Sequence, residues 1–85
     1  MLMKYRDKRK QEECIQYTGE NILELSEWAG DYCTVDKYSN ILIEDYYGKD
    51  KVCEEGDFVI YDSNNGFSVI SRSTFLTDFC IVEEK

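Results

Sequence analysis

The sequence predicts a small α+β protein: a curled antiparallel β-sheet of about six strands with two short helices. Short β-branched and aromatic segments recur along the chain, separated by turn residues. Only one segment, about residues 22–29, repeats its apolar residues with a clear helical period. The 85 residues suit one domain with a thin core, so we expect 1–85 to fold as a single unit.

The segment from Phe58 to Tyr61 is the predicted centre of the sheet. It is apolar at every position, which is typical of a strand covered on both faces. The acidic segment Glu54–Asp57 precedes it, and Gly56 gives that segment the backbone freedom of a tight turn.

An earlier strand is predicted at about residues 10–18. Its alternation places Ile15 and Tyr17 on one face and Cys14 and Gln16 on the other. Residues 4–10 are too charged to be buried, and we expect the basic strap 1–10 to lead into this strand as an edge or a crossing strand.

The predicted helix over 22–29 has recognisable ends. Asn21 and Glu24 have the spacing of a capping box, and Gly30 is placed to end the helix. We expect Trp28 to pack the helix onto the sheet.

The remaining elements follow from turn signals. Asn65-Gly66 predicts a type I′ hairpin turn, and Gly48 with its neighbours predicts another hairpin. Ser73 is the predicted cap of a short helix at about 74–78. The other strands are predicted at 31–36, 41–47, 51–53, 67–70 and 80–82, and 83–85 is a solvated tail.

Charge is distributed unevenly along the chain. The net charge is −8, yet residues 1–10 hold five basic side chains and one acidic side chain, and the other 75 residues hold five basic and 17 acidic ones. An acidic body repels nucleic acid and anionic lipid and attracts basic protein surfaces, although acidity also serves solubility alone. We therefore expect no direct nucleic-acid binding and no membrane association.

No apolar stretch approaches the length of a membrane span, and no apolar segment follows the charged start as in a signal peptide. The expected location is the cytoplasm.

Four cysteines are many for a chain without a secretion signal, and they suggest a structural zinc site. Zinc takes four thiolates in a tetrahedral structural site, and the chain has no histidine. Against this, C-x-x-C pairs are absent, and the alternative explanation is that the cysteines are four buried, small apolar side chains. The candidate ligands are Cys14, Cys33, Cys53 and Cys80.

The composition argues against an enzyme. Without histidine, Ser-His and Cys-His nucleophile systems are excluded. Carboxylate pairs such as Glu54 with Asp57 need a substrate cleft, for which a sheet of this size has little room.

Several segments together carry a resemblance. Lys4-Tyr5-Arg6 is followed by Glu13 to Asn21, and Gly56 to Ile60 reads G-D-F-V-I. These segments resemble a family of small phage and prophage proteins with a K-Y-R-x-K-P opening, an E-A-x-Q-[WFY]-T-G segment and a G-D-[YWF]-[IV]-I corner. The resemblance implies a phage origin and no general enzymatic role. Arg9 stands where the family has Pro, and the family pattern does not require the cysteines.

By analogy with small acidic phage proteins, we expect an inhibitor of bacterial immunity. The expected role is that of an anti-CRISPR protein, which binds a Cas9-type effector in the host cytoplasm and blocks DNA binding or loading. The alternative is a phage accessory protein, either zinc-stabilised or metal-free, that serves as an interaction module. We expect one partner-binding patch, formed by Asp45, Tyr46, Tyr47, Asp50, Glu54, Glu55 and Asp57.

Overall fold

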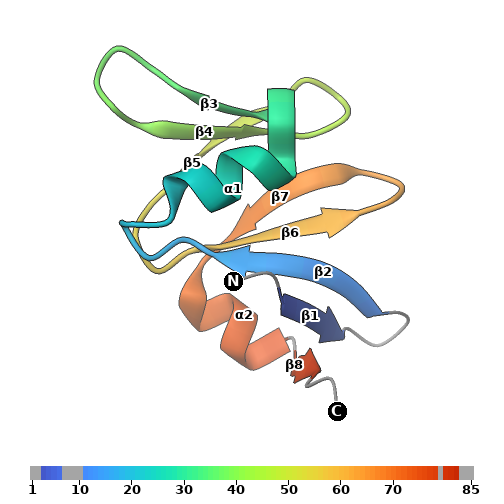
Figure 1. The fold of residues 1–85 in the computed structure, drawn as a ribbon. Coiled ribbons are helices and arrows are strands. Elements are labelled where there is room, and N and C mark those ends of the chain that lie inside the picture. Colours follow the sequence, from blue (N-terminus) through green and yellow to red (C-terminus); the bar gives the residue numbers. More distant parts are fainter. Residues whose placement is uncertain (1–2, 7–10, 79, 83–85) are drawn as a thin grey trace.

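In the part of the chain that the structure describes, eight strands form two antiparallel sheets, and two α-helices flank them (Figure 1). The computed structural model describes residues 3–6, 11–78 and 80–82, and the side chains from Glu13 to Thr77. The larger sheet has the order β7-β6-β2-β1-β8, and the smaller has the order β3-β4-β5. The predicted α+β class is confirmed, but the strands are divided between two sheets.

The predicted helices are both present. Helix α1 spans Ile22–Ala29, as expected, and runs into the 3₁₀ turn η1 (Gly30–Tyr32), while α2 spans Arg72–Asp78. The larger sheet contains β1 (Met3–Arg6), β2 (Gln11–Gln16), β6 (Phe58–Asp62), β7 (Gly66–Ile70) and β8 (Cys80–Val82). The smaller sheet contains β3 (Cys33–Val35), β4 (Ile41–Glu44) and β5 (Asp50–Cys53).

Strand β6 has the central role that its apolar sequence predicted. It pairs with β2 on one side and with β7 on the other. Val59 is fully buried in one hydrophobic cluster, whereas Phe58 and Ile60 belong to a second cluster. Because side chains alternate along a strand, these clusters lie on opposite faces of the larger sheet.

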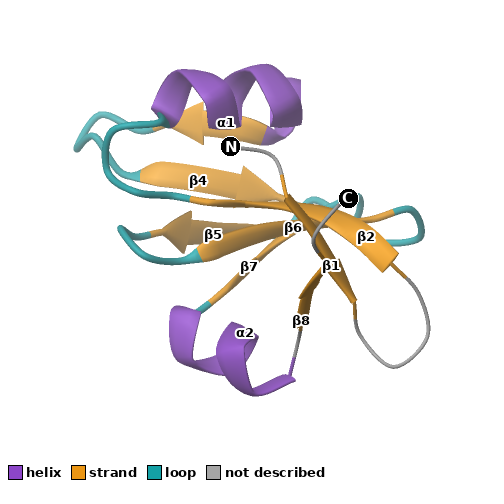
Figure 2. Ribbon diagram, turned by 60° about the horizontal axis from the view of Figure 1, so that its bottom comes forward, coloured by secondary structure: helices purple, strands orange, loops and turns teal. Residues whose placement is uncertain are grey.

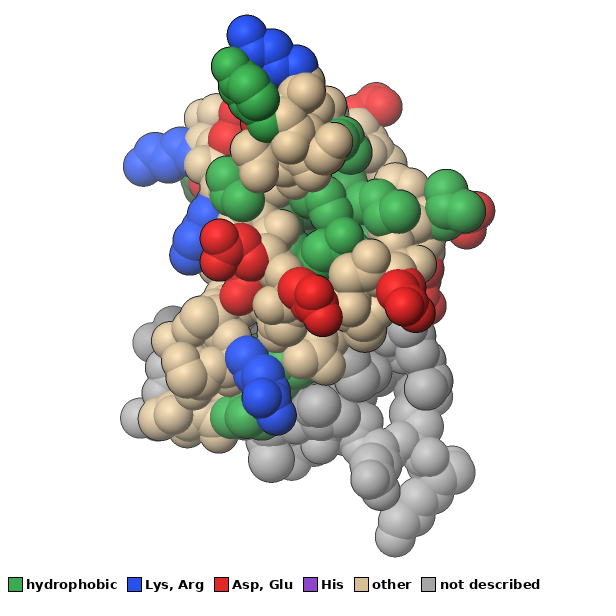
Figure 3. Space-filling model, turned by 90° about the vertical axis from the view of Figure 1, so that its left-hand side faces the viewer, with side chains coloured by type: hydrophobic (Ala, Val, Ile, Leu, Met, Phe, Trp, Pro, Cys, Tyr) green, Lys and Arg blue, Asp and Glu red, His purple; other side chains and the backbone are tan. Residues whose placement is uncertain are grey.

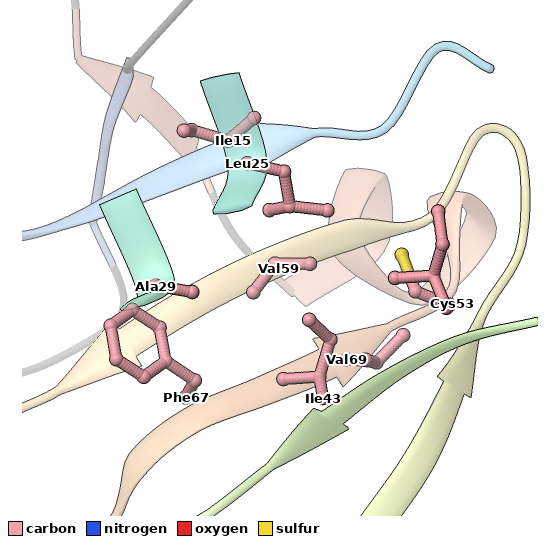
Figure 4. Packing of buried hydrophobic residues seen from close by; sticks show 9 residues of the cluster. Ile15, Leu25, Ala29, Ile43, Cys53, Val59, Phe67 and Val69 are labelled. Carbon is pink, nitrogen blue, oxygen red and sulfur yellow. The ribbon is translucent and has the colours of Figure 1, made fainter. Parts of the chain in front are cut away.

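The first cluster lies between the larger sheet and a layer formed by α1 and the smaller sheet (Figure 4). Its buried members are Ile15, Leu25, Ala29, Ile41, Ile43, Cys53, Val59, Phe67 and Val69. Trp28 packs edge-on against Phe67, with ring centroids 5.0 Å apart, so its predicted packing role is confirmed.

The second cluster attaches α2 to the opposite face. Phe75 is 1% exposed, and its ring stacks on Phe58 at a centroid distance of 3.9 Å. Cys14 and Ile60 complete the cluster. The two helices consequently lie on opposite sides of the molecule (Figure 2).

Of the two roles predicted for the basic N-terminal segment, an edge strand and a crossing strand, the edge strand is wrong. Residues 3–6 form β1, which pairs with β2 on one side and with β8 on the other. Its backbone is therefore inside the larger sheet. Residues 7–10 and the predicted tail 83–85 lie outside the described residues.

Both helix starts differ in detail from the predicted caps. Asn21 makes no side-chain cap bond; its Oδ1 accepts from the Thr18 N–H at 2.8 Å, and its Nδ2 donates to the Gln16 carbonyl at 2.9 Å. At α2 the cap is Ser71 rather than Ser73, since the Ser71 Oγ accepts from the Thr74 N–H at 3.3 Å. Gly30, with φ 59°, ends α1 as predicted.

Three local predictions need correction. In the β6–β7 hairpin only Gly66 has a positive φ, 84°, so the loop is not the predicted type I′ turn, which needs positive φ at both central residues. The segment predicted as a strand at 31–36 begins with η1 and contributes only β3. The strand predicted at 41–47 ends at Glu44, where the chain turns.

Candidate binding surface

The acidic corner is a tight turn that joins the smaller sheet to the larger one. The Asp57 N–H donates to the Glu54 carbonyl at 3.0 Å, and Gly56 at the third position has φ 95°, as a type II turn requires. The Asp57 carboxylate accepts from the Glu54 N–H at 3.0 Å. Asp57 therefore stabilises the turn, and Glu54 and Glu55 are the exposed carboxylates.

The corner is also tied to the end of β2. The Gly56 N–H donates to the Tyr17 carbonyl at 2.7 Å, and the Tyr17 N–H donates to the Asp57 carbonyl at 2.9 Å. The Glu55 side chain lies over Gly19, where a Cβ would come within 3.2 Å of it. On this end of the molecule, acidic side chains border a group of hydrophobic ones (Figure 3).

The turn between β4 and β5 holds the other predicted partner residues. The Asp45 carboxylate accepts from the Tyr47 N–H at 2.8 Å and from the Lys49 N–H at 3.0 Å, so it stabilises this turn. Tyr47 is 71% exposed. Asp50, the first residue of β5, is also exposed.

Tyr46 joins this turn to the larger sheet. Its N–H donates to the Asn65 carbonyl at 3.0 Å, and its ring lies against the backbone of Gly66. Its hydroxyl is 2.8 Å from the hydroxyl of Tyr61, and this hydrogen bond raises the pKa of Tyr46 above its usual value. Rings of Tyr32 and Phe67 extend the contact into the core.

The predicted residues therefore form two groups rather than one patch. Asp45, Tyr46, Tyr47 and Asp50 lie at one end of β5, and the corner lies at its other end. Since a strand rises about 3.3 Å per residue, Asp50 and Glu54 are roughly 13 Å apart along the chain. A partner protein with a compact interface would therefore contact one of these two groups, or its interface would extend along the length of β5.

A shallow cleft of about 250 Å³ lies between the β4–β5 hairpin and β7. Lys51 lies at this cleft, and its Nζ donates to the Val69 carbonyl at 3.1 Å. Ile43, Phe67 and Val69 are the apolar residues that line the cleft. Lys51 was not among the residues predicted from the sequence, although its position opposite buried Ile43 in the β4–β5 register indicates an inward-facing residue.

The structure does not bring the predicted zinc ligands together as one group. Cys14 lies in the cluster beneath α2, whereas Cys53 and Cys33 belong to the cluster on the other face of the sheet. Among the described residues, no three His, Cys, Asp or Glu side chains are grouped so as to hold a metal ion. The Cys80 side chain lies outside the described set, so the site stays a prediction, which elemental analysis of protein purified without chelator tests.

Burial explains the state of the cysteine thiols. It raises the pKa of Cys14 to about 11. Burial is also the largest influence on Cys53, whose pKa rises to about 12 with a further contribution from the charge of Asp57. These thiols are therefore protonated at neutral pH and behave as small apolar side chains.

The sequence matches no protein-family model, and comparisons with curated proteins and with solved structures give no significant match. None of the helices in the described part of the chain is long and apolar enough to cross a membrane.

Proposed function

We propose that this protein acts by binding a basic surface of another protein, without catalysis. The observation that supports this most is the exposure of its carboxylates, since no charged side chain among the described residues is buried. From residue 13 to residue 77 the chain has 13 acidic and four basic side chains. Such an excess speeds the encounter with cationic surfaces and disfavours nucleic acid.

The target that we propose is a Cas9-type nuclease of a bacterial host, with the protein encoded by a phage. Nucleases of this type hold the guide–target duplex in a positively charged channel. Carboxylates bound in that channel would take the place of phosphates and block DNA binding or loading. The protein would then inhibit bacterial immunity from within the host cytoplasm.

The chain offers suitable chemistry for such an interface. Exposed Tyr47 and half-exposed Tyr46 provide amphipathic contact area at one end of β5, and Glu54 and Glu55 provide carboxylates at the other. Tyrosine is enriched among the residues that contribute most to binding energy, and carboxylates pair with arginine and lysine.

Calorimetric titration of the purified protein into guide-loaded nuclease tests this proposal. We expect binding that competes with target DNA and weakens steeply as salt concentration rises, because the attraction is between exposed charges. The absence of binding at low salt would reject the nuclease as target. Binding that is insensitive to salt would reject the electrostatic basis.

A charge reversal locates the contribution of the corner. Glu55→Lys should slow association with the nuclease, whereas Glu27→Lys on α1 makes the same charge change at another exposed position and should have a smaller effect. Equal effects from both variants would mean that only net charge matters.

A further inference from the structure

The smaller sheet has an outer face that differs from its buried face. Ile41, Ile43 and Cys53 point into the first cluster, so alternation directs the side chains between them outward. Val52 is 42% exposed, and Leu42 is half-buried. In Figure 1, α1 and the larger sheet both lie below this sheet, on its buried side.

The strand register builds a short apolar row across this outer face. Leu42 lies opposite Thr34 of β3 on one side and opposite Val52 of β5 on the other. These three residues come from all three strands of the sheet, so the row spans its width.

Carboxylates flank the row on both sides. Glu44 and Asp50 lie directly opposite each other, two residues from Leu42 and Val52 along their strands. Like charges in this arrangement destabilise a sheet, and a cation placed between them would relieve the repulsion. On the other side of the row, Glu54 follows buried Cys53 and is exposed like Val52, so it borders the row there.

We propose that this outer face is the docking surface for a basic amphipathic helix of the partner protein. The face is defined by Thr34, Leu42, Glu44, Asp50, Val52 and Glu54. The choice of occupant rests on charge complementarity, because an apolar row between carboxylates fits an apolar side chain between lysines or arginines. A helix has 3.6 residues per turn and rises 1.5 Å per residue, so basic residues about seven positions apart lie on one face with a rise of about 10.5 Å between them. Their long side chains can reach Asp50 and Glu54, which are roughly 13 Å apart along β5.

This inference rests on the proposed function, since it names the surface and the kind of segment that the partner presents. It also joins Asp50 and Glu54, which lie at opposite ends of β5, into one binding face. The contact needs no change in the fold, because the face is already open in the described residues.

The test is a titration of ¹⁵N-labelled protein with a synthetic helical peptide that has a leucine face and two lysines about seven residues apart on that same face. We expect amide shift changes concentrated on β4, β5 and Glu54, and weaker changes elsewhere. Val52→Lys should weaken peptide binding roughly tenfold or more, because it replaces the apolar contact with a like charge.

Leu23→Lys is the matched control, since Leu23 is 75% exposed on α1 and the substitution is the same type of change. Thermal melts of both variants verify that each is folded. Shift changes centred on α1 or the corner, equal losses from the two variants, or no peptide binding would overturn the docking face. The peptide experiment does not involve the nuclease, so failure of the nuclease titration alone rejects the target and leaves this face supported.

Discussion

At Gly66 the ring of Tyr46 leaves no room for a side chain. Its φ is 84°, and a Cβ would lie 2.6 Å from Cδ1 of the Tyr46 ring. Gly66→Ala should therefore combine a left-handed backbone cost of about 1–2 kcal/mol with displacement of that ring. We expect a clear loss in the free energy of unfolding, measured by urea denaturation.

Gly48→Ala separates the two contributions. Gly48 has a similar φ of 81°, but a Cβ there meets only the Glu44 carboxylate at 3.9 Å. This variant should lose only the backbone part. Equal losses for Gly66→Ala and Gly48→Ala would show that the Tyr46 ring moves aside at little cost.

Because the Cys14 thiol is buried, the free energy of unfolding should fall as the pH rises into the alkaline range. Its folded pKa of about 11 is above the usual thiol value of about 8.5, so the folded state disfavours the thiolate. The stabilisation is complete below the unfolded pKa and is lost as pH rises toward 11. Across that window this thiol contributes at most about 1.4 kcal/mol per pH unit.

Urea denaturation from about pH 8 to about pH 11 checks this dependence. The slope of unfolding free energy against pH should be smaller in Cys14→Ala than in the wild type. An unchanged slope would mean that other groups account for the alkaline loss.

In the part of α2 whose side chains the structure describes, one side chain is buried, the ring of Phe75. Phe75 is 1% exposed and stacks on Phe58. Phe75→Ala should cost about 3–5 kcal/mol, because it leaves a cavity in a small cluster. Hydrogen exchange should then show early opening of α2.

Leu76→Ala removes a similar apolar side chain from the next position, which is 60% exposed. It should change stability by less than about 0.5 kcal/mol. A comparable loss from both variants would mean that α2 is not held through the Phe58–Phe75 stack.

Local sequence pattern predicted the elements better than their partners. Phe58–Tyr61 was correctly assigned as a central strand because apolar residues at every position require cover on both faces. The basic residues near the start hid β1, although Met3 to Arg6 alternates apolar and basic residues as strands do. The alternation of apolar and polar residues identifies the buried face of a strand, but it does not show which other strands pair with that strand. The division of the strands into two sheets was therefore not predicted.

For the whole molecule, the candidate site was only partly predictable. Sequence proximity correctly associated Glu54 and Glu55 with a turn, yet it merged them with Tyr46 and Tyr47, which lie at the other end of β5. Asp45 and Asp57 are engaged with turn backbone, a role that a count of charges does not reveal. The docking face depends on register across three strands, which is set by long-range packing.

The hydrogen bond from Lys51 to the Val69 carbonyl bears on whether the protein self-associates in concentrated solution. Strand β7 is an edge strand of the larger sheet. The unprotected edge of such a strand can pair with strands from other molecules. Lys51 places a positive charge at this edge, and its hydrogen bond occupies the Val69 carbonyl, which an added strand would use as an acceptor. We therefore expect Lys51 to protect this edge against aggregation.

Lys51→Ala should consequently increase self-association at high protein concentration, as measured by sedimentation velocity. Lys49→Ala makes the same change in net charge at an exposed position nearby and should leave the protein dispersed. Equal association of both variants would assign the effect to lost charge. If the sedimentation-coefficient distribution of Lys51→Ala is the same as that of the wild type, other parts of the chain prevent β7 from pairing with strands of other copies.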